Sequence, residues 1–212
     1  MLCSPAAKGP LSMCDTPARR SLVFWCLPLL ISWFGVGCGS KVETVKVKNY
    51  KMALVERVLS LETEFMQLVR DFNQAARIKV LTYEKDMAQA NSPIVVTKGL
   101  KSKTGGKIGL GQWIAQTESA SSFALTSQSS RQETTYFSMR VEFDADYIQS
   151  RLGTSDPVKQ YEKQKLFFHE VGHGLEMDHV KDPRDVMYDD VDGEKDFEAF
   201  FARVRAYMQD RE

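Results

Sequence analysis

The body of this chain contains no cysteine and no excess of charge of either sign. The four cysteines, at positions 3, 14, 26 and 38, all lie in the first 38 of 212 residues. The chain beyond them cannot form an internal disulfide, so it must be stabilised by packing alone. Lys and Arg together number 28, as do Asp and Glu, which excludes the basic excess typical of proteins that bind nucleic acids.

No apolar run in the sequence is long enough to cross a bilayer as a helix. The segment from Leu22 to Val36 has 15 residues, whereas a spanning helix needs about 20. Arg19 and Arg20 precede this run, and small residues follow it at positions 35–37. A charged start, a short apolar stretch and a small-residue exit are typical of a secretory signal peptide, which we predict at residues 1–37.

The end of this segment, Gly-Val-Gly-Cys38, resembles the signal of bacterial lipoproteins, in which the cysteine becomes the lipidated first residue of the mature chain. The resemblance implies cleavage before Cys38 and a membrane anchor on that residue; plain cleavage and an uncleaved anchor are the alternatives. Gly35 stands where leucine is usual, and Met13 is an alternative start. The implied location is the bacterial cell envelope, lipid-anchored or secreted, and Gly39 favours the outer membrane if the cell is Gram-negative.

The remaining chain is expected to form a tether at residues 38–50, with a possible strand at Val42 to Val47, and one domain at residues 51–212. Apolar residues recur at helical spacing from Lys51 to Ala76, which predicts a long amphipathic helix. Asp156 as N-cap and Pro157 at the first helical position predict the start of a second long helix. The apolar residues between Lys195 and Met208 predict a last one.

Between the first two helices the sequence favours strands. The Ser-rich segment from Ser119 to Ser130 is expected to be a mobile loop. The lysines at positions 98, 101, 103 and 107 flank Gly-rich turns and are interpreted as a solvated loop without a function. Strands are predicted at Ile78 to Tyr83, Pro93 to Thr97, Ile108 to Ala115 and Thr134 to Phe143.

The three histidines of the chain all lie within one short segment, His169-Glu170-Val-Gly-His173-Gly-Leu-Glu-Met-Asp-His179. On a helix, His169 and His173 share one face a turn apart, so both imidazoles can bind one Zn²⁺ at about 2.0–2.1 Å. Glu170 lies about 100° round the helix, near a metal-bound water, whose proton it can take as general base. A short His-Glu-x-x-His pattern also occurs by chance, but the third histidine and the predicted helix favour a zinc site.

His179 can bind the same metal only if the chain turns back after His173. A continuing helix would carry it about 9 Å along the axis. Gly174 is a plausible place for the helix to end. Three protein ligands leave one position open for water, which is the arrangement of a catalytic zinc rather than a structural one.

This segment resembles the zinc motif of the metzincin metalloproteases, HExxHxxGxxH, and most closely that of the matrixin branch. The stretch His179-Val-Lys-Asp-Pro183-Arg-Asp-Val-Met187-Tyr188 is similar to the matrixin segment that leads into the Met-turn. The resemblance implies that Met187 forms a hydrophobic floor beneath the zinc and that Tyr188 follows it in the turn; ordinary core packing is the alternative for both.

The resemblance also implies a fold and a substrate-binding strand. The fold would be α+β, with a twisted, mixed and mostly parallel sheet carrying two long helices and a small C-terminal subdomain that ends in a helix. The segment Ile108 to Ala115 would be the edge strand that pairs with extended peptide. Structural Ca²⁺ is compatible with the resemblance, but the sequence identifies no site for it.

The sequence departs from the family pattern at three places. Glu176 stands where the family has a glycine that often takes a positive φ, at a cost of about 1 kcal/mol unless Gly174 makes the turn instead. Asp189 and Asp190 replace the proline-containing wall of the specificity pocket, so pocket preference cannot be transferred. No cysteine lies between Cys38 and the domain, so latency through a cysteine–zinc bond is not expected.

The sequence therefore predicts a zinc-dependent endopeptidase of the bacterial envelope, with a protein or peptide as substrate. Two alternatives remain. A zinc-binding envelope lipoprotein with a binding or structural role is favoured by Glu176, and a zinc hydrolase could also act on a non-peptide bond. Loss of function on replacing Glu170 would distinguish the enzyme from the binding protein.

Overall fold

The computed structural model describes residues 42–56, 58–122, 130–190 and 193–209. The predicted signal peptide and Cys38 lie outside the described residues. Over the part of the chain that is described, no helix combines the length and the apolar character needed to cross a membrane.

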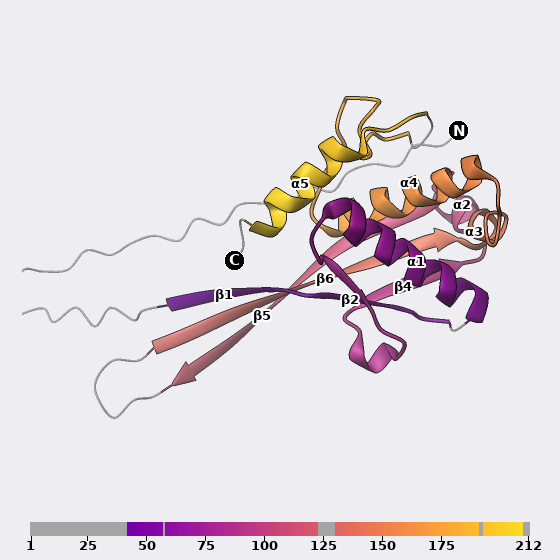
Figure 1. Cartoon of the computed structure of the whole chain (residues 1–212). Coiled ribbons are helices and arrows are strands. Elements are labelled where there is room, and N and C mark those ends of the chain that lie inside the picture. The colour runs from indigo at the N-terminus through magenta and orange to yellow at the C-terminus, as the bar shows by residue number, and fades with distance from the viewer. Residues whose placement is uncertain (1–41, 57, 123–129, 191–192, 210–212) are drawn as a thin grey trace, which may run out of the picture. The chain divides into compact units, whose positions relative to one another are not determined.

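One six-stranded sheet organises the described chain (Figure 1). Its strands follow the order β1-β6-β4-β2-β3, and β5 pairs with β6 beside this path. Four of the five strand pairings are parallel, and β5 runs antiparallel to β6, which confirms the predicted mixed, mostly parallel sheet. The strands are β1 (Val42–Lys48), β2 (Tyr50–Leu54), β3 (Leu81–Tyr83), β4 (Ser92–Thr97), β5 (Gly109–Ser122) and β6 (Ser130–Asp144).

Two long helices pack on this sheet, as predicted, and both lie on the same face of it. The ring of Phe143, on β6, lies 5.5 Å from that of Phe65 and 6.2 Å from that of Phe167, which belong to the two helices. Phe201 of the last helix then packs on Phe72, with ring centroids 5.1 Å apart. The helices are α1 (Leu59–Ala76), α2 (Leu100–Lys103), α3 (Ala145–Gln149), α4 (Pro157–Gly174) and α5 (Phe197–Gln209), with a 3₁₀ turn η1 (Met87–Gln89).

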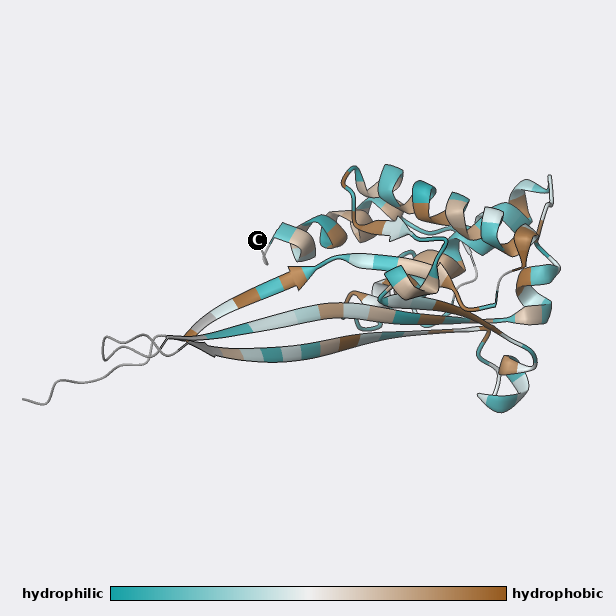
Figure 2. Cartoon of the chain, turned by 90° about the horizontal axis from the view of Figure 1, so that it is seen from below, coloured by the Kyte–Doolittle hydropathy of each residue, from teal (hydrophilic) through white to brown (hydrophobic). Residues whose placement is uncertain are grey.

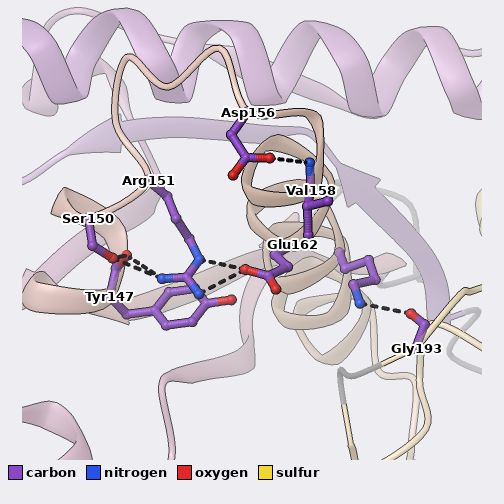
Figure 3. A network of polar contacts seen from close by, with 8 residues as sticks. Tyr147, Ser150, Arg151, Asp156, Val158, Glu162 and Gly193 are labelled. Carbon is purple, nitrogen blue, oxygen red and sulfur yellow. Dashed lines mark hydrogen bonds and ion pairs between the residues drawn. The ribbon is translucent and has the colours of Figure 1, made fainter.

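The start of α4 is built as the sequence predicts. The Asp156 carboxylate accepts a hydrogen bond from the Val158 N–H at 2.9 Å, and Pro157 occupies the first turn. Figure 3 shows this cap beside Arg151, whose guanidinium donates to Glu162 at 2.8 and 3.0 Å and lies 3.6 Å from the Tyr147 ring. These contacts fix the end of α4 that lies far from the histidines.

The predicted helix from Lys51 to Ala76 is wrong in its first part. Residues Tyr50–Leu54 form β2, which pairs with β3 and β4 inside the sheet, and α1 begins only at Leu59. Four of the five residues of β2 are buried. A short strand buried in a parallel sheet is nearly continuously apolar, so periodicity cannot distinguish it from a helix turn.

The predicted loop from Ser119 to Ser130 is also wrong at its ends, because β5 continues to Ser122 and β6 begins at Ser130. Residues 123–129 lie outside the described residues. The outer halves of β5 and β6 join β1 in a three-stranded extension, residues 42–48, 112–122 and 130–136, which we call the finger (Figure 1). The outer parts of β5 and β6 carry few strongly hydrophobic residues (Figure 2), and the side chains of residues 112–120 are exposed. A polar, solvated strand of this kind shows no apolar alternation, so the sequence signals a loop.

Candidate metal centre

The three histidines meet at one point of the structure. Their Nε2 atoms lie 3.2 Å (His169 to His173), 3.0 Å (His173 to His179) and 3.3 Å (His169 to His179) apart. His169 is buried, His173 is partly buried and His179 is exposed, so the cluster extends from the interior to the surface of the protein. The structure therefore brings together the three residues that the sequence predicted as ligands.

The opposite nitrogen of each imidazole has an acceptor of its own. His169 Nδ1 lies 2.7 Å from the Val186 carbonyl and His173 Nδ1 lies 2.9 Å from the Met177 carbonyl. His179 Nδ1 lies 3.3 Å from Asp189 Oδ1. Because a carbonyl can only accept, Nδ1 of His169 and Nδ1 of His173 carry the proton, and the Nε2 of each has its lone pair free.

This arrangement fits a bound cation. Three ligand nitrogens of a tetrahedral metal, each at about 2.05 Å, lie about 3.3 Å from one another, and the observed spacings of 3.0–3.3 Å are close to this. Three converging lone pairs repel one another unless a positive charge lies between them. The outer acceptors are those that orient metal-bound histidines in proteins. The triad can therefore hold a metal ion.

Burial also keeps two of the histidines ready to bind a metal. It lowers the pKa of His169 to about 4, against the opposing effect of the Val186 carbonyl. Burial likewise lowers the pKa of His173. Both imidazoles are therefore neutral at pH 7, which is the form that ligates.

The chain returns to the histidine triad through a tight turn at the end of α4. The Met177 N–H donates to the Gly172 carbonyl at 3.0 Å, and the Glu176 N–H donates to the His173 carbonyl at 3.1 Å. This pair of bonds is the Schellman motif, which requires a left-handed residue just past the helix. Glu176 takes that place with φ 62°. A glutamate, and not a glycine, therefore makes this turn.

The alternative of a turn through Gly174 is wrong. Gly174 is the last residue of α4, and residues with positive φ do not include it. A Cβ on Gly174 would lie 2.7 Å from Met139 Sδ. It is glycine because β6 passes close to the helix there, while Glu176 makes the turn.

A second turn, at residues 185–188, supports the triad from behind. The Asp185 carboxylate accepts the Met187 N–H at 2.7 Å, and the Tyr188 N–H donates to the Asp185 carbonyl at 3.2 Å. Two carbonyls of this turn bind different segments. The Val186 carbonyl accepts from His169, and the Met187 carbonyl accepts the Val180 N–H at 3.0 Å. The turn therefore fixes both His169 and the segment that follows His179.

Met187 is fully buried under α4, at 0% exposure. A Cβ on Gly172 would overlap its sulfur, so the helix can lie on this methionine only with glycine at that position. Tyr188 follows it in the turn and is partly buried.

Glu170 lies beside the triad with a polar atom that has no partner. Its side chain is buried, and Oε2 makes no hydrogen bond. Burial raises the pKa of Glu170 to about 8, against the opposing effects of the Gly111 N–H and the Lys107 charge. A buried, partnerless carboxyl oxygen requires a ligand, a water or an ion to satisfy it, and its surroundings mark Glu170 as a candidate functional group.

The start of β5 lies directly against Glu170. A Cβ on Gly109 would lie 2.7 Å from Glu170 Cδ, and one on Gly111 would lie 2.8 Å from His173 Cβ and would overlap the Glu170 carbonyl. Only glycine permits this approach of strand to helix. Sequence reasoning missed both residues, although two glycines at alternate positions of a predicted strand indicate a close backbone contact on one face.

A cleft of about 680 Å³ opens over these residues. Its lining joins the triad and Glu170 to the start of β5 and to Asp189 and Asp190. Lys107 lies there as well, so its interpretation as part of a loop without function is incomplete. Nothing in the local sequence distinguishes it from the neighbouring lysines, because only the fold brings it to the cleft.

Comparison with known proteins does not extend this description. No family model, no curated protein and no solved structure matches the chain significantly.

Proposed function

We propose that this protein is a zinc-dependent endopeptidase of the metzincin type. The observation that carries the proposal is the partnerless Glu170 Oε2 in the cleft that also exposes the triad. Three histidine ligands would leave one position of a tetrahedral zinc open, as catalytic sites require. A structural site would close that position with a fourth protein ligand, and the triad is the one group of three or more such side chains found among the described residues.

The roles of the residues follow from their surroundings. His169, His173 and His179 would hold the ion, which when bound supplies Lewis acidity toward the scissile carbonyl and an activated water. Glu170 would take the proton of the attacking water and later deliver it to the leaving amine. Its ionised form, disfavoured by burial, is favoured by any cation at the triad and by Lys107.

The order of the elements supports the metzincin type. A long helix, several strands, the histidine-bearing helix, a methionine turn and a last helix follow one another, as in the family that the motif resembles. The left-handed Glu176 further supports the proposal, because the turn that brings His179 back is kept without its usual glycine. The alternative function, binding without catalysis, was favoured by Glu176 as a sign of an altered turn. Because Glu176 makes the turn in the left-handed conformation, it no longer favours that alternative.

The start of β5 would bind the substrate backbone. β5 pairs with β6 along one side, and no second described strand pairs with it. Its free side therefore offers backbone N–H and C=O groups to an extended peptide beside Glu170, in the manner of strand addition. We further propose that Cys38 carries a lipid that anchors the enzyme to the cell envelope.

The proposal is tested by loading the purified protein with Zn²⁺ and incubating it with a diverse peptide library. Cleavage should disappear with a chelator and in Glu170→Ala, while Glu56→Ala, at an exposed position outside the cleft, should retain it. Metal content measured on both variants separates loss of chemistry from loss of metal. A folded, zinc-loaded protein that cleaves no peptide would refute the peptidase function and favour the binding lipoprotein.

A further inference from the structure

We propose that the substrate continues beyond the cleft as a strand added to the outer part of β5, from Trp113 to Thr117. This inference rests on the proposed function, which places only the start of β5 at the substrate. It names the substrate class as unfolded or extended polypeptide, recognised through its main chain on one side of the cleft.

The backbone groups of every second residue of β5 point away from β6. The two strands are antiparallel, and their register places Ile108 opposite Asp144. The Asp144 N–H donates to the Ile108 carbonyl at 2.9 Å, so the even-numbered residues of β5 form the hydrogen-bonded pairs with β6. The odd-numbered residues direct their N–H and C=O groups to the other side, where the Gly111 N–H bonds to Glu170.

This outward row continues past the cleft. Trp113, Ala115 and Thr117 follow Gly111 at alternate positions of the same strand. In the part of the chain that the structure describes, no strand and no loop bonds to their outward N–H or C=O groups. From Gly111 to Thr117 the strand rises about 20 Å. An added strand could therefore make main-chain hydrogen bonds at three positions outside the cleft.

β5 lacks the features that keep edge strands from pairing. All 14 of its residues pair one to one with β6, without a bulge, and it contains no proline and no lysine. β1, on the other side of β6 in the finger, carries Lys46 and Lys48 within its seven residues. Exposed edges usually carry lysines, prolines or bulges that prevent unwanted pairing, so β5 is the edge of the finger that is open to an added strand.

The continuity of this edge with the cleft indicates what would occupy it. Gly109 and Gly111 line the cleft, and β5 runs on from them in one register. A peptide that pairs with β5 beside Glu170 can therefore follow the finger. The side chains of residues 115–120 are exposed and small or polar, which leaves little apolar surface for a stable interface with a second folded chain.

Trp113 gives the edge one side-chain preference. It lies on the side of β5 that faces α4, because Gly111, two residues earlier, approaches His173. Trp113 is 52% exposed, so an apolar residue opposite it on an added strand would cover the indole. Trp113 is also the only tryptophan after Cys38, which makes its fluorescence a reporter of this edge.

The test uses a short peptide that is cut and two versions of it, extended by about six residues at the N-terminal or the C-terminal end. We expect one extension, and not the other, to raise kcat/KM about 10-fold. N-methylation of one alternate set of amides in that extension should remove the gain, and methylation of the other set should not, because every second N–H of an added strand points to solvent.

A matched pair of variants tests the protein side. Thr117→Pro removes an outward N–H and should lose most of the gain, whereas Thr117→Val keeps this N–H and should retain the gain. Both changes remove the bond between the Thr117 and Thr135 hydroxyls, so they differ in the backbone group. The short peptide should be cut equally by both variants. The methylated peptides test the same bonds without any change to the protein.

A binding measurement separates this inference from the proposed peptidase function. The zinc-loaded Glu170→Gln variant is titrated with the same peptides while Trp113 emission is recorded. The favourable extension should lower Kd about 10-fold and shift the emission to shorter wavelength, and Trp113→Phe should abolish the shift. If no peptide is cut but these results hold, the peptidase proposal fails and the strand addition stands. Equal Kd values for the three peptides would overturn the inference, as would a dimer that Thr117→Pro dissociates.

Discussion

Arg203 of α5 grips the carboxylate of Asp185 with two nitrogens, Nη1 at 2.5 Å from Oδ2 and Nη2 at 2.7 Å from Oδ1. The same carboxylate accepts the Met187 N–H, and the next carbonyl, that of Val186, accepts from His169. A residue of the last helix is thus connected to a metal ligand through one carboxylate and one turn. The last helix therefore helps to build the candidate metal centre.

Replacing Arg203 should weaken both the fold and the site. Arg203→Met would leave the Asp185 carboxylate, 6% exposed, without its cation. Removing one partner of a buried pair costs about 3–5 kcal/mol, and the partial exposure of Arg203 reduces this to about 2–3 kcal/mol. Urea denaturation would measure the loss, and a metal titration should show weaker binding.

A control separates this effect from the loss of any arginine. Arg184 pairs with Asp182 on the surface, with 79% and 53% of their side chains exposed, and Arg184→Met should cost no more than about 0.5 kcal/mol. If the two variants were equally stable, the Asp185–Arg203 pair would add no more to the stability of the fold than a surface pair does.

Asp185 should also make stability depend on pH in the acid range. Burial opposes its ionisation, but the Arg203 and Met187 hydrogen bonds and the charges of Arg203 and Lys195 outweigh it and hold its pKa below the ordinary value of 3.8. The unfolded chain then binds more protons than the folded one, so this stability is complete above the unfolded pKa and is lost as the pH falls through the folded one.

The metal-free protein should therefore lose less stability below about pH 4 when it carries Asp185→Asn. Denaturation curves at pH 3 to 6 would show this as a flatter acid limb. Asp146→Asn should follow the unmodified protein, and an acid limb of unchanged slope in Asp185→Asn would contradict the expectation.

Glu176→Gly should stabilise the protein. The residue has φ 62°, and a left-handed conformation costs a non-glycine residue about 1–2 kcal/mol. Glycine removes this strain, but its greater freedom in the unfolded chain offsets part of the gain. We expect a net gain of about 0.5–1 kcal/mol with unchanged metal binding. Glu176→Ala keeps the Cβ and should give no gain, so thermal melting of the two variants separates strain from side-chain contacts.

Gly111→Ala should separate β5 from α4. The added Cβ would overlap the Glu170 carbonyl and lie 2.8 Å from His173 Cβ, and backbone cannot yield as a flexible side chain can. We expect a loss of about 3 kcal/mol or more, together with loss of metal binding. Gly105→Ala meets nothing within 4 Å but keeps φ at 72°, and should cost about 1 kcal/mol. An ordering opposite to this one in chemical denaturation would disprove the close contact.

Asp189 should contribute to metal affinity through His179. Outer partners of metal-bound histidines are worth about 10–100-fold in affinity, and because Asp189 is 83% exposed we expect about 10-fold weaker binding for Asp189→Ala. Competition with a zinc-binding dye would measure it. Asp146→Asn, which removes a charge from an exposed residue outside the cleft, should bind as the unmodified protein does.

The sequence predicted the parts of the site that follow local rules. Spacing by four residues places His169 and His173 together on any helix, and Asp156 with Pro157 marks where that helix begins. The sequence did not decide whether Glu176 or Gly174 makes the turn that brings His179 back. A glycine normally makes such a turn, and Gly174 was the nearest glycine. The strain at Glu176 is tolerated only because two backbone hydrogen bonds and the packing around the triad hold it.

Other parts depend on contacts between distant segments and leave no local pattern. Gly111 and Asp189 matter because β5 and the segment that follows the triad come together with α4 only in the folded chain. The strand Tyr50–Leu54 was assigned to a helix because it is buried on both sides. The end of β5 was assigned to a loop because the side chains of residues 112–120 are exposed on both sides of the strand.

The finger sets the distance between the cleft and the start of β1. Val42 pairs with Arg131, and Gly111 beside Glu170 pairs with Val141, so ten residues of β6 separate the two points. At about 3.3 Å per residue, the cleft stands about 33 Å from the place where the chain enters the sheet. Val42 follows Cys38 by four residues. If Cys38 carries a lipid, as we propose, the cleft would lie this far along β6 from the anchored end of the sheet.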